Sequence, residues 1–285
     1  MTRRLLVSIV VLLTTSWMAH AQNPVFSSKV EAVRVDVLVT AGGKPLRGLG
    51  PGDFEVFDNG VRQQVDLVSF EALPLNVVLA LDVSDSITGE RLLHLRSAGH
   101  VLLTALKPND QAALVTFSRA VTLDAGLSRD TPRLHGVLNA ITPGGDTSLI
   151  DGSYAAMTIG ESDVGRSLVI VFSDGVDTSS WLSADAVLNI AKRCNAIVYA
   201  VSVGGTPKAD FLGDLTDQTG GRRFKADSTK DIGDVFLQML DEFRQRYVVS
   251  YSPQGVAPDG WHKLTVRVRN QMVDVKARPG YFAGK

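Results

Sequence analysis

Residues 75–86 read LNVVLALDVSDS, and this stretch decides the fold. It begins as a nearly continuous apolar run, which is typical of a strand that is buried on both faces of its sheet. The run ends in Asp82, Ser84 and Ser86, so oxygen-bearing side chains follow the strand directly. Two later segments have a similar apolar form, SLVIVFSDG at 167–175 and AIVYAVSVG at 196–204. Together they predict the buried strands of one sheet.

Helical patterns alternate with these strands. Leucine and valine recur at roughly helical spacing over residues 87–106, and AALVTFS at 112–118 predicts the next strand. Further helices are predicted at 132–141, 149–159, 183–194 and 230–245. Repeated βα units imply a parallel sheet with helices on both faces. Over residues 74–245 we therefore predict an α/β fold with a doubly wound, mostly parallel sheet.

Both ends of the chain show the two-residue period of strands with one buried face. The N-terminal part contains VEAVRVDVLVT at 30–40 and a hairpin signal at Asn59-Gly60. The C-terminal part contains YVVSYSP at 247–253, KLTVRVRN at 263–270 and MVDVKARPGYF at 272–282. We predict β segments over 22–73 and 246–285 that form one small β domain, with the α/β domain inserted between them. The alternative is two separate β appendages on the α/β domain.

The first residues have the form of a secretory signal peptide. Arg3 and Arg4 precede an apolar run over 5–13, and Ala19-His20-Ala21 is a small-residue cleavage pattern. We predict a signal peptide over 1–21 that is cleaved near Ala21, which implies a periplasmic or secreted protein; the alternative is an uncleaved interfacial anchor. A membrane span needs about 20 apolar residues, and we expect none in the mature chain.

Composition narrows the classes of partner. The chain has 29 basic and 30 acidic residues, a formal net charge of −1, so no overall field favours nucleic acid or an anionic membrane. Cys194 is the only cysteine, which rules out an intrachain disulfide. Its apolar surroundings in the sequence predict a buried packing residue and not a reactive thiol.

Three loops at predicted strand ends are rich in oxygen. They are DVSDS at 82–86, GGDTS at 144–148 and SDG at 173–175, and they contain neither sulfur nor imidazole. Ligand sites in open parallel sheets lie outside the carboxyl ends of the strands. Hydroxyls with few carboxylates suit Mg²⁺ or Mn²⁺, whereas zinc prefers nitrogen and sulfur. If Asp82 and Asp174 balance the charge of the ion, neutral hydroxyl ligands leave it able to attract an external carboxylate.

The DVSDS segment matches the D-x-S-x-S metal-ion-dependent adhesion site motif of von Willebrand factor type A domains, and residues 75–245 resemble that family. By similarity, Thr147 corresponds to the threonine of the second loop and Asp174 to the aspartate of the third. In that family the serines and the threonine contact the metal, and the aspartates contact it directly or through water. The flanking β segments look like those of bacterial exported proteins related to this family.

The resemblance implies a protein-binding or adhesion module that is not an enzyme. We expect Mg²⁺, with Mn²⁺ or Ca²⁺ as alternatives, at Asp82, Ser84, Ser86, Thr147 and Asp174. The partner would be an extracytoplasmic protein that presents an Asp or Glu. Asp85 and Asp146 add negative charge beside this site; they either support the ligands from behind or, as we favour, are solvated loop carboxylates. Trp181 is expected either on a contact surface around the metal or in the core.

Two alternatives remain open at this stage. One is a structural role in which the metal only ties the three loops together. The other is a metal-dependent hydrolase, for which Asp85 or Asp146 would have to act as general base. Among the five histidines, His94, His100, His135 and His262 fall on predicted helices or terminal strands, and His20 lies in the signal peptide. Neither a nucleophile elbow nor a phosphate-binding loop is present in the sequence.

Overall fold

The structure is a computed structural model of the 285-residue chain, and it describes residues 32–70, 73–161, 165–174, 176–203, 211–269 and 271–284. All of them belong to a compact unit that spans Glu31–Lys285. The predicted signal peptide over 1–21, its cleavage site at Ala21 and Gly175 of the third loop lie outside the described residues.

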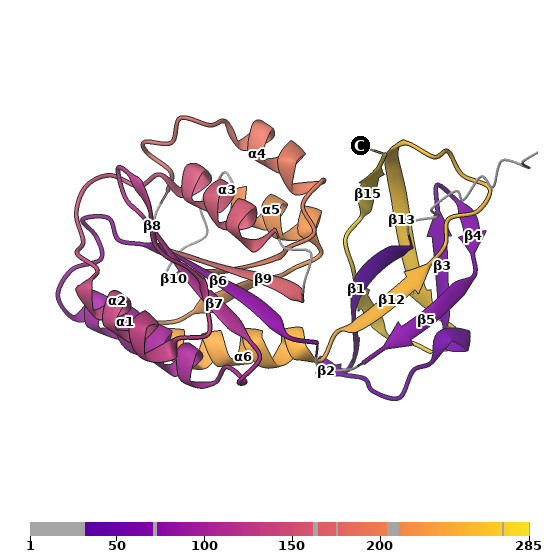
Figure 1. The fold of residues 1–285 in the computed structure, drawn as a ribbon, viewed down its shortest axis with the longest axis horizontal. Coiled ribbons are helices and arrows are strands. Elements are labelled where there is room, and N and C mark those ends of the chain that lie inside the picture. The colour runs from indigo at the N-terminus through magenta and orange to yellow at the C-terminus, as the bar shows by residue number, and fades with distance from the viewer. Residues whose placement is uncertain are drawn as a thin grey trace, which may run out of the picture. The chain divides into compact units, whose positions relative to one another are not determined.

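A six-stranded sheet forms the centre of the α/β part, in the order β11-β10-β9-β6-β7-β8 (Figure 1). All neighbouring strands are parallel except β7 and β8, which are antiparallel. The strands are β6 (Leu75–Asp82), β7 (Gln111–Phe117), β8 (Val121–Ser128), β9 (Arg166–Ser173), β10 (Ile197–Val203) and β11 (Arg223–Ala226). Every residue of β6 is buried, as its apolar run predicts. The predicted fold class is confirmed.

Helices cover both faces of this sheet (Figure 1). One face packs against α1 (Glu90–Thr104), α2 (Thr131–Ala140) and α6 (Ile232–Arg244), and the other packs against α3 (Leu149–Gly160), α4 (Ala184–Ala191) and α5 (Phe211–Thr219). Alternate residues of β6 contribute to the two cores: Val77, Leu79 and Leu81 to the first, Val78 and Ala80 to the second. Within the described residues, no helix is long and apolar enough to cross a membrane.

The structure contains α1, α2, α3, α4 and α6 in place of the predicted helices at 87–106, 132–141, 149–159, 183–194 and 230–245. The bounds of α2 and α3 differ from prediction by one residue, whereas α1, α4 and α6 are shorter than predicted. A short 3₁₀ turn, η2 (Thr229–Asp231), precedes α6. The sequence did not indicate β8, α5 or β11. β8 is an edge strand whose residues are mostly exposed or half-buried, so it lacks the apolar run that marks its neighbours. α5 and β11 are too short for a clear period.

Strands from both ends of the chain share two further sheets. In the first, β1 (Val33–Ala41) lies between β12 (Tyr247–Tyr251) and β14 (Asp274–Lys276); β5 (Val65–Ser69) pairs with β12, and β2 (Lys44–Pro45) with β1. In the second, β13 (Gly260–Val268) lies between β3 (Phe54–Asp58) and β15 (Gly280–Ala283), and β4 (Val61–Gln63) pairs with β3; η1 (Pro51–Asp53) precedes β3. The inward valines of β1 and β12 and the apolar residues of β3 and β13 form one core cluster.

The hairpin signal at Asn59-Gly60 forms the turn between β3 and β4. Both residues have positive φ, 47° for Asn59 and 83° for Gly60. A two-residue turn of this kind matches the twist of antiparallel strands, and Asn followed by Gly adopts it with little strain. The Asn59 side chain also accepts a hydrogen bond from the Lys263 amide at 2.9 Å, which joins the turn to β13.

A buried carboxylate joins four strands of the β part. Asp58 is 0% exposed, and its Oδ1 is hydrogen-bonded to His262 Nδ1 at 2.7 Å. Its Oδ2 accepts the hydroxyls of Tyr251 at 2.9 Å and Tyr281 at 2.8 Å. Burial raises the pKa of both tyrosines, so both phenols remain protonated donors at neutral pH. The network links β3 from the N-terminal segment to β12, β13 and β15 from the C-terminal segment.

The single cysteine lies in the core beneath α3 and α4. Cys194 is 5% exposed, and burial, together with the nearby Glu161 carboxylate, raises the pKa of its thiol to about 12. Because the thiolate is the reactive form, this thiol is inert near neutral pH. Its predicted role as a packing residue is confirmed.

We predict that Asp58→Ala lowers the free energy of unfolding by about 3 kcal/mol, since His262 and both tyrosine hydroxyls would lose a buried partner. Urea unfolding measures the change. Asp66→Ala is the matched control, because Asp66 is exposed on the same β part and accepts a hydrogen bond from the Ser252 hydroxyl, so its effect should stay within about 0.5 kcal/mol. Equal unfolding midpoints for the two variants would contradict a stabilising role for the Asp58 network.

Candidate metal centre

The three loops are joined to one another at the carboxyl edge of the central sheet, but the second does not follow a strand, contrary to the prediction, because it joins α2 to α3. Backbone hydrogen bonds join the first loop to the second, from Gly144 N to the Val83 carbonyl at 2.8 Å and from Asp85 N to the Gly145 carbonyl at 3.0 Å. From here on, the third loop includes the residues that lead to α4, up to 183. The second loop is joined to it, since the Thr147 carbonyl accepts hydrogen bonds from the amides of Thr178 at 2.8 Å and Ser179 at 3.1 Å. Segments that are far apart in the sequence therefore form one connected surface.

Asp82 forms the floor of this site. It is the last residue of β6 and is 0% exposed. Its Oδ1 accepts a hydrogen bond from the Ser84 amide at 2.9 Å, and its Oδ2 accepts one from the Ser173 hydroxyl at 2.7 Å. Burial raises the pKa of Asp82; hydrogen bonds from Ser84 and Ser173 oppose that shift, and the negative charge of Asp174 adds to it. A carboxylate in this environment favours a nearby cation.

Ser84, Ser86 and Asp174 extend from the floor as a chain of oxygen atoms. The hydroxyl oxygens of Ser84 and Ser86 lie 3.1 Å apart, and the Ser86 hydroxyl donates to Asp174 Oδ1 at 2.8 Å. Neighbouring ligands of an octahedral Mg²⁺ with bonds of about 2.0–2.1 Å lie about 2.9 Å apart. The spacing of these three side chains is therefore that of adjacent ligands on such an ion.

Thr147 is held at the site through its backbone. Its amide donates to the Thr178 hydroxyl at 2.9 Å, in addition to the two bonds that its carbonyl accepts. The next residues begin α3, whose first amides, those of Ile150 and Asp151, both donate to the Ser180 hydroxyl at 3.1 Å. Thus the structure brings Asp82, Ser84, Ser86 and Asp174 into a hydrogen-bonded chain and places Thr147 in the loop that contacts both others. The role of all five as metal ligands stays a prediction.

Exposure rises from the floor to the rim. Asp82 is 0%, Ser84 4% and Thr147 7% exposed, whereas Ser86 is in the exposed class. An ion beside these oxygens would be protected by protein on one side and accessible from solvent on the other. The donors are also mostly hydroxyls: no group of three or more His, Cys, Asp or Glu with metal-binding spacing occurs within the described ranges.

Asp85 and Asp146, the two additional carboxylates, are both exposed, and each side chain also has a partner. Asp85 Oδ1 accepts a hydrogen bond from Gly145 N at 2.8 Å and so reinforces the contact between the first and second loops. Asp146 Oδ2 forms an ion pair with Arg119 Nη2 at 3.1 Å, and both side chains are more than half exposed. Short polar side chains often bond to nearby backbone amides in loops, but the partner of Asp85 lies in a different loop, which the sequence cannot show.

Sequence reasoning missed two residues that contact the site. Ser173, the last residue of β9, donates to Asp82 from the neighbouring strand. Arg91 donates from Nη1 to Asp174 Oδ2 at 2.9 Å and to the Ser86 carbonyl at 3.3 Å. A signal for Arg91 existed, because a basic side chain in the first turn of a helix is unfavourable unless an acidic group lies nearby.

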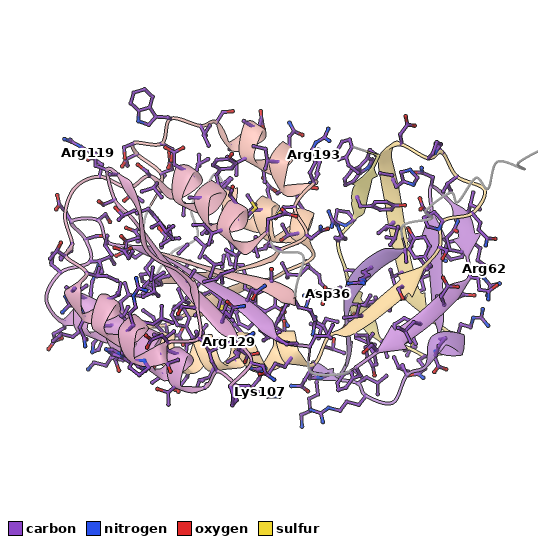
Figure 2. The ribbon with its side chains drawn as sticks, in the orientation of Figure 1. Asp36, Arg62, Lys107, Arg119, Arg129 and Arg193 are labelled. Carbon is purple, nitrogen blue, oxygen red and sulfur yellow. The ribbon has the colours of Figure 1, made fainter. Side chains whose placement is uncertain are left out.

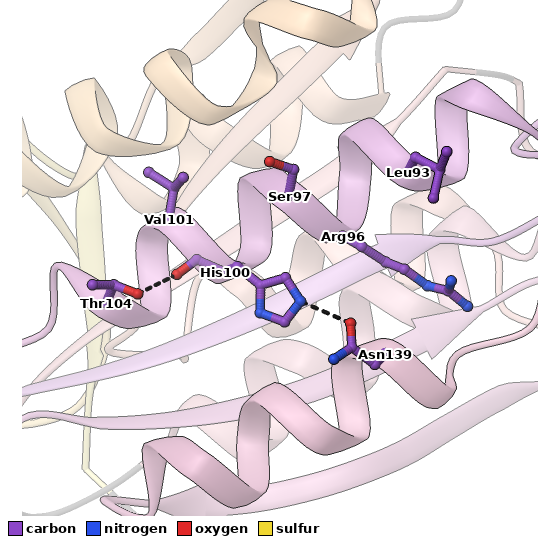
Figure 3. A pocket seen from close by; sticks show the side chains of 7 residues that line it. All are labelled: Leu93, Arg96, Ser97, His100, Val101, Thr104 and Asn139. Carbon is purple, nitrogen blue, oxygen red and sulfur yellow. Dashed lines mark hydrogen bonds between the residues drawn. The ribbon is translucent and has the colours of Figure 1, made fainter.

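Histidines lie away from the three loops. His94 and His100 are on α1, His135 on α2 and His262 on β13. His100 lines a shallow hollow between α1 and α2, where its Nε2 is hydrogen-bonded to Asn139 Oδ1 at 2.8 Å (Figure 3). The described part of these loops contains no imidazole, and the carboxylates Asp85 and Asp146 are bonded to Gly145 N and Arg119 respectively.

The family model described as von Willebrand factor type A domain matches residues 76–238. The mouse (Mus musculus) inter-alpha-trypsin inhibitor heavy chain H2 is 24% identical over 186 residues, which cover 60% of this chain but only 20% of that protein.

Solved structures show the same fold. The von Willebrand factor type A protein from Catenulispora acidiphila has a TM-score of 0.54 at 13% identity, over 84% of this chain and 73% of that one. Proximal thread matrix protein 1 from the mussel byssus, solved with a zinc-occupied MIDAS motif, has a TM-score of 0.54 at 16% identity, over 64% and 48% of the chains. The PilB minor pilin from Streptococcus sanguinis has a TM-score of 0.50 at 13% identity, over 61% and 62%.

We predict that Asp82→Asn stabilises the metal-free protein at neutral pH. Because the pKa of Asp82 is raised in the folded state, the wild type loses stability as the pH rises through that pKa and the buried group ionises. Asparagine can accept from Ser84 N and donate to Ser173 without a charge. A gain of about 1 kcal/mol would raise Tm by roughly 2–4 °C.

Thermal unfolding in EDTA measures this difference, which should shrink in acid, where the wild-type carboxyl is protonated. The control is Asp185→Asn, which changes an exposed carboxylate at the start of α4. An Asp82→Asn protein that melts below the wild type at neutral pH would show that the buried charge does not destabilise the fold.

Proposed function

This chain belongs to the von Willebrand factor type A domain family, and from that premise we propose that it is a metal-dependent protein-binding module. The observation that carries the proposal is the chain of oxygens that runs from the buried Asp82 through Ser84 and the exposed Ser86 to Asp174, whose side chain is 7% exposed. It has the donors, the spacing and the accessibility that a cation shared with a partner requires.

The ion that fits best is Mg²⁺, with Mn²⁺ and Ca²⁺ as alternatives. The residues that would hold it are Asp82, Ser84, Ser86, Thr147 and Asp174, and all of them offer oxygen. Hard divalent cations prefer such ligands, whereas nitrogen and sulfur favour zinc. Two carboxylates balance the charge of the ion, and neutral hydroxyls complete the protein side. When bound, the ion would supply a positive charge that attracts an anion from outside.

The ligand of that ion would be an Asp or Glu of another extracytoplasmic protein. A metal that only tied the loops together would be enclosed by protein ligands, whereas Ser86 lies at an exposed rim. The open side leaves room for a carboxylate to join the coordination sphere. We propose no catalytic step for this site, and the near-neutral charge of the chain does not favour nucleic acid.

Export and domain division complete the proposal. The pattern of residues 1–21 supports a signal peptide that is cleaved near Ala21, and a periplasmic or secreted protein.

We place the domain boundaries near residues 74 and 245, because β6 begins at Leu75 and α6 ends at Arg244. The α/β domain would thus be inserted between segments 22–73 and 246–285, whose described strands pair with one another.

Calorimetric titration of EDTA-treated protein with Mg²⁺, Mn²⁺ and Ca²⁺ tests the metal. We expect saturable binding to one site that weakens more than tenfold in Asp82→Ala and in Thr147→Ala, since each variant removes a ligand. Asp185→Ala, an exposed change in the same domain, should bind as the wild type does. If the wild type shows no saturable heat with any of these ions, the metal-dependent function is wrong.

Arg91 should weaken metal binding, because its guanidinium and the ion compete for Asp174. The Arg91 side chain is 55% exposed, so this ion pair contributes modestly. We predict that Arg91→Ala raises the affinity for Mg²⁺ about two- to fivefold, and that added salt reduces the gain. The same titration of Arg129→Ala, an exposed arginine after β8 (Figure 2), is the control and should show no gain. Unchanged or weaker binding in Arg91→Ala would contradict the competition.

A further inference from the structure

Trp181 is on the surface and not in the core. Its exposed fraction is 95%, which excludes the packing role that the sequence left open. An indole is costly to leave in water, and a patch of exposed large apolar side chains is more informative than a buried one. Tryptophan is also enriched among the residues that dominate binding energy at protein interfaces. The exposure of Trp181 therefore needs a cause.

The backbone beneath this indole is firmly held. Asp151 accepts the amides of Trp181 at 2.9 Å and Leu182 at 3.0 Å, one on each carboxylate oxygen. In return, the Ser180 hydroxyl accepts the amide of Asp151 at 3.1 Å. These reciprocal bonds join the third loop to the first turn of α3. These bonds hold the backbone of Trp181 in place, which lowers the entropy that the loop loses when a partner covers the indole.

A shallow hollow of about 480 Å³ lies beside the indole, and its lining is largely apolar. It is formed by Trp181 and Leu182 from the third loop, Tyr154 and Ala155 from α3, and Val121 from β8. Tyr154 and Trp181 are the two aromatic side chains among the exposed large hydrophobic residues of the described chain, and both line this hollow. Because both rings lie at one place, the hollow differs from the single apolar residues that are scattered over the rest of the surface.

The hollow is adjacent to the loop that contains Thr147 of the proposed metal site. Ser148 lines it and directly follows Thr147 in the chain, and its hydroxyl is 2.9 Å from that of Ser179. Arg119 borders the same hollow, and its side chain is 80% exposed while paired to Asp146 (Figure 2). A segment whose carboxylate reached the ion would place its neighbouring residues over this surface. There they would meet two aromatic rings and a guanidinium.

We propose that this hollow binds an aromatic side chain that lies within a few residues of the metal-bound Asp or Glu of the partner. Aromatic rings favour offset or edge contacts with Trp and Tyr, and a guanidinium packs well on an aromatic face. An aliphatic side chain would gain burial but not these contacts. This inference rests on the proposed metal-dependent function. It adds an aromatic residue to the metal-bound Asp or Glu as the second feature of the partner that this protein would recognise.

Acetylated and amidated peptides of Gly and Ser test the proposal, each with one central Asp and one Phe, Leu or Ala at a varied position. Fluorescence anisotropy of labelled peptides with Mg²⁺ or EDTA gives their affinities for the protein. We expect Mg²⁺-dependent binding that is about tenfold or more tighter for the best Phe peptide than for its Ala counterpart. In Trp181→Ala this preference should vanish, while Mg²⁺ titrates as in the wild type.

Met272→Ala is the matched control, since Met272 is fully exposed on the β part and should leave the preference intact. Mg²⁺-dependent binding that is equal for Phe and Ala peptides, or a Phe preference that persists in Trp181→Ala, would overturn the inference and leave the metal-dependent function standing. If no peptide binds in a Mg²⁺-dependent way and no metal titrates, both fail together.

Discussion

The carboxylate of Asp82 is fully buried at the end of a fully buried strand, and the arrangement of the site depends on satisfying that group. One of its oxygens is bonded to the chain just beyond β6, through the Ser84 amide, and the other to the end of β9, through the Ser173 hydroxyl. Because β6 and β9 are parallel neighbours, their carboxyl ends meet, and Asp174 follows within the same edge. The buried group thus determines where the first and third loops must lie.

The same sheet explains why the candidate metal site lies beyond the ends of the strands and not on a face of the sheet. β6 contributes alternate side chains to two separate cores, so neither face of the strand can hold a functional group. Backbone groups of the strands are paired along the sheet, whereas the loops beyond the strand ends have amides and carbonyls that strand pairing does not use. In those loops the Gly144, Asp85 and Thr147 backbones bond to neighbouring loops, which gives a rigid base to hydroxyls that would otherwise be mobile.

Periodicity alone predicted most of the α/β fold, because buried parallel strands and amphipathic helices have clear hydrophobic patterns. β8 was not predicted, because it is an edge strand with few buried residues and has little hydrophobic pattern. Asp82, Ser84, Ser86 and Asp174 were also accessible from the sequence, because they follow strands whose carboxyl ends lie at one edge of a parallel sheet. Thr147 lies between α2 and α3, so only the family resemblance indicated it. The sequence did not predict the contacts of Arg91 and Ser173 with the site, or the Asp58 network. Asp58 and His262 are separated by 204 positions, and their contact depends on the antiparallel register of β3 and β13, which no local pattern records.

A metal ion that binds carboxylates cannot by itself select a partner, because Asp and Glu occur on almost every protein surface. Selectivity is a difference between affinities, and it must come from groups around the ion that one partner satisfies and others do not. On the Thr147 side of this site those groups are Trp181, Tyr154 and Arg119, and on the Asp174 side the neighbour is the paired Arg91. The ion would attract any carboxylate. The apolar and cationic surface beside the ion would then determine which residues next to that carboxylate bind favourably.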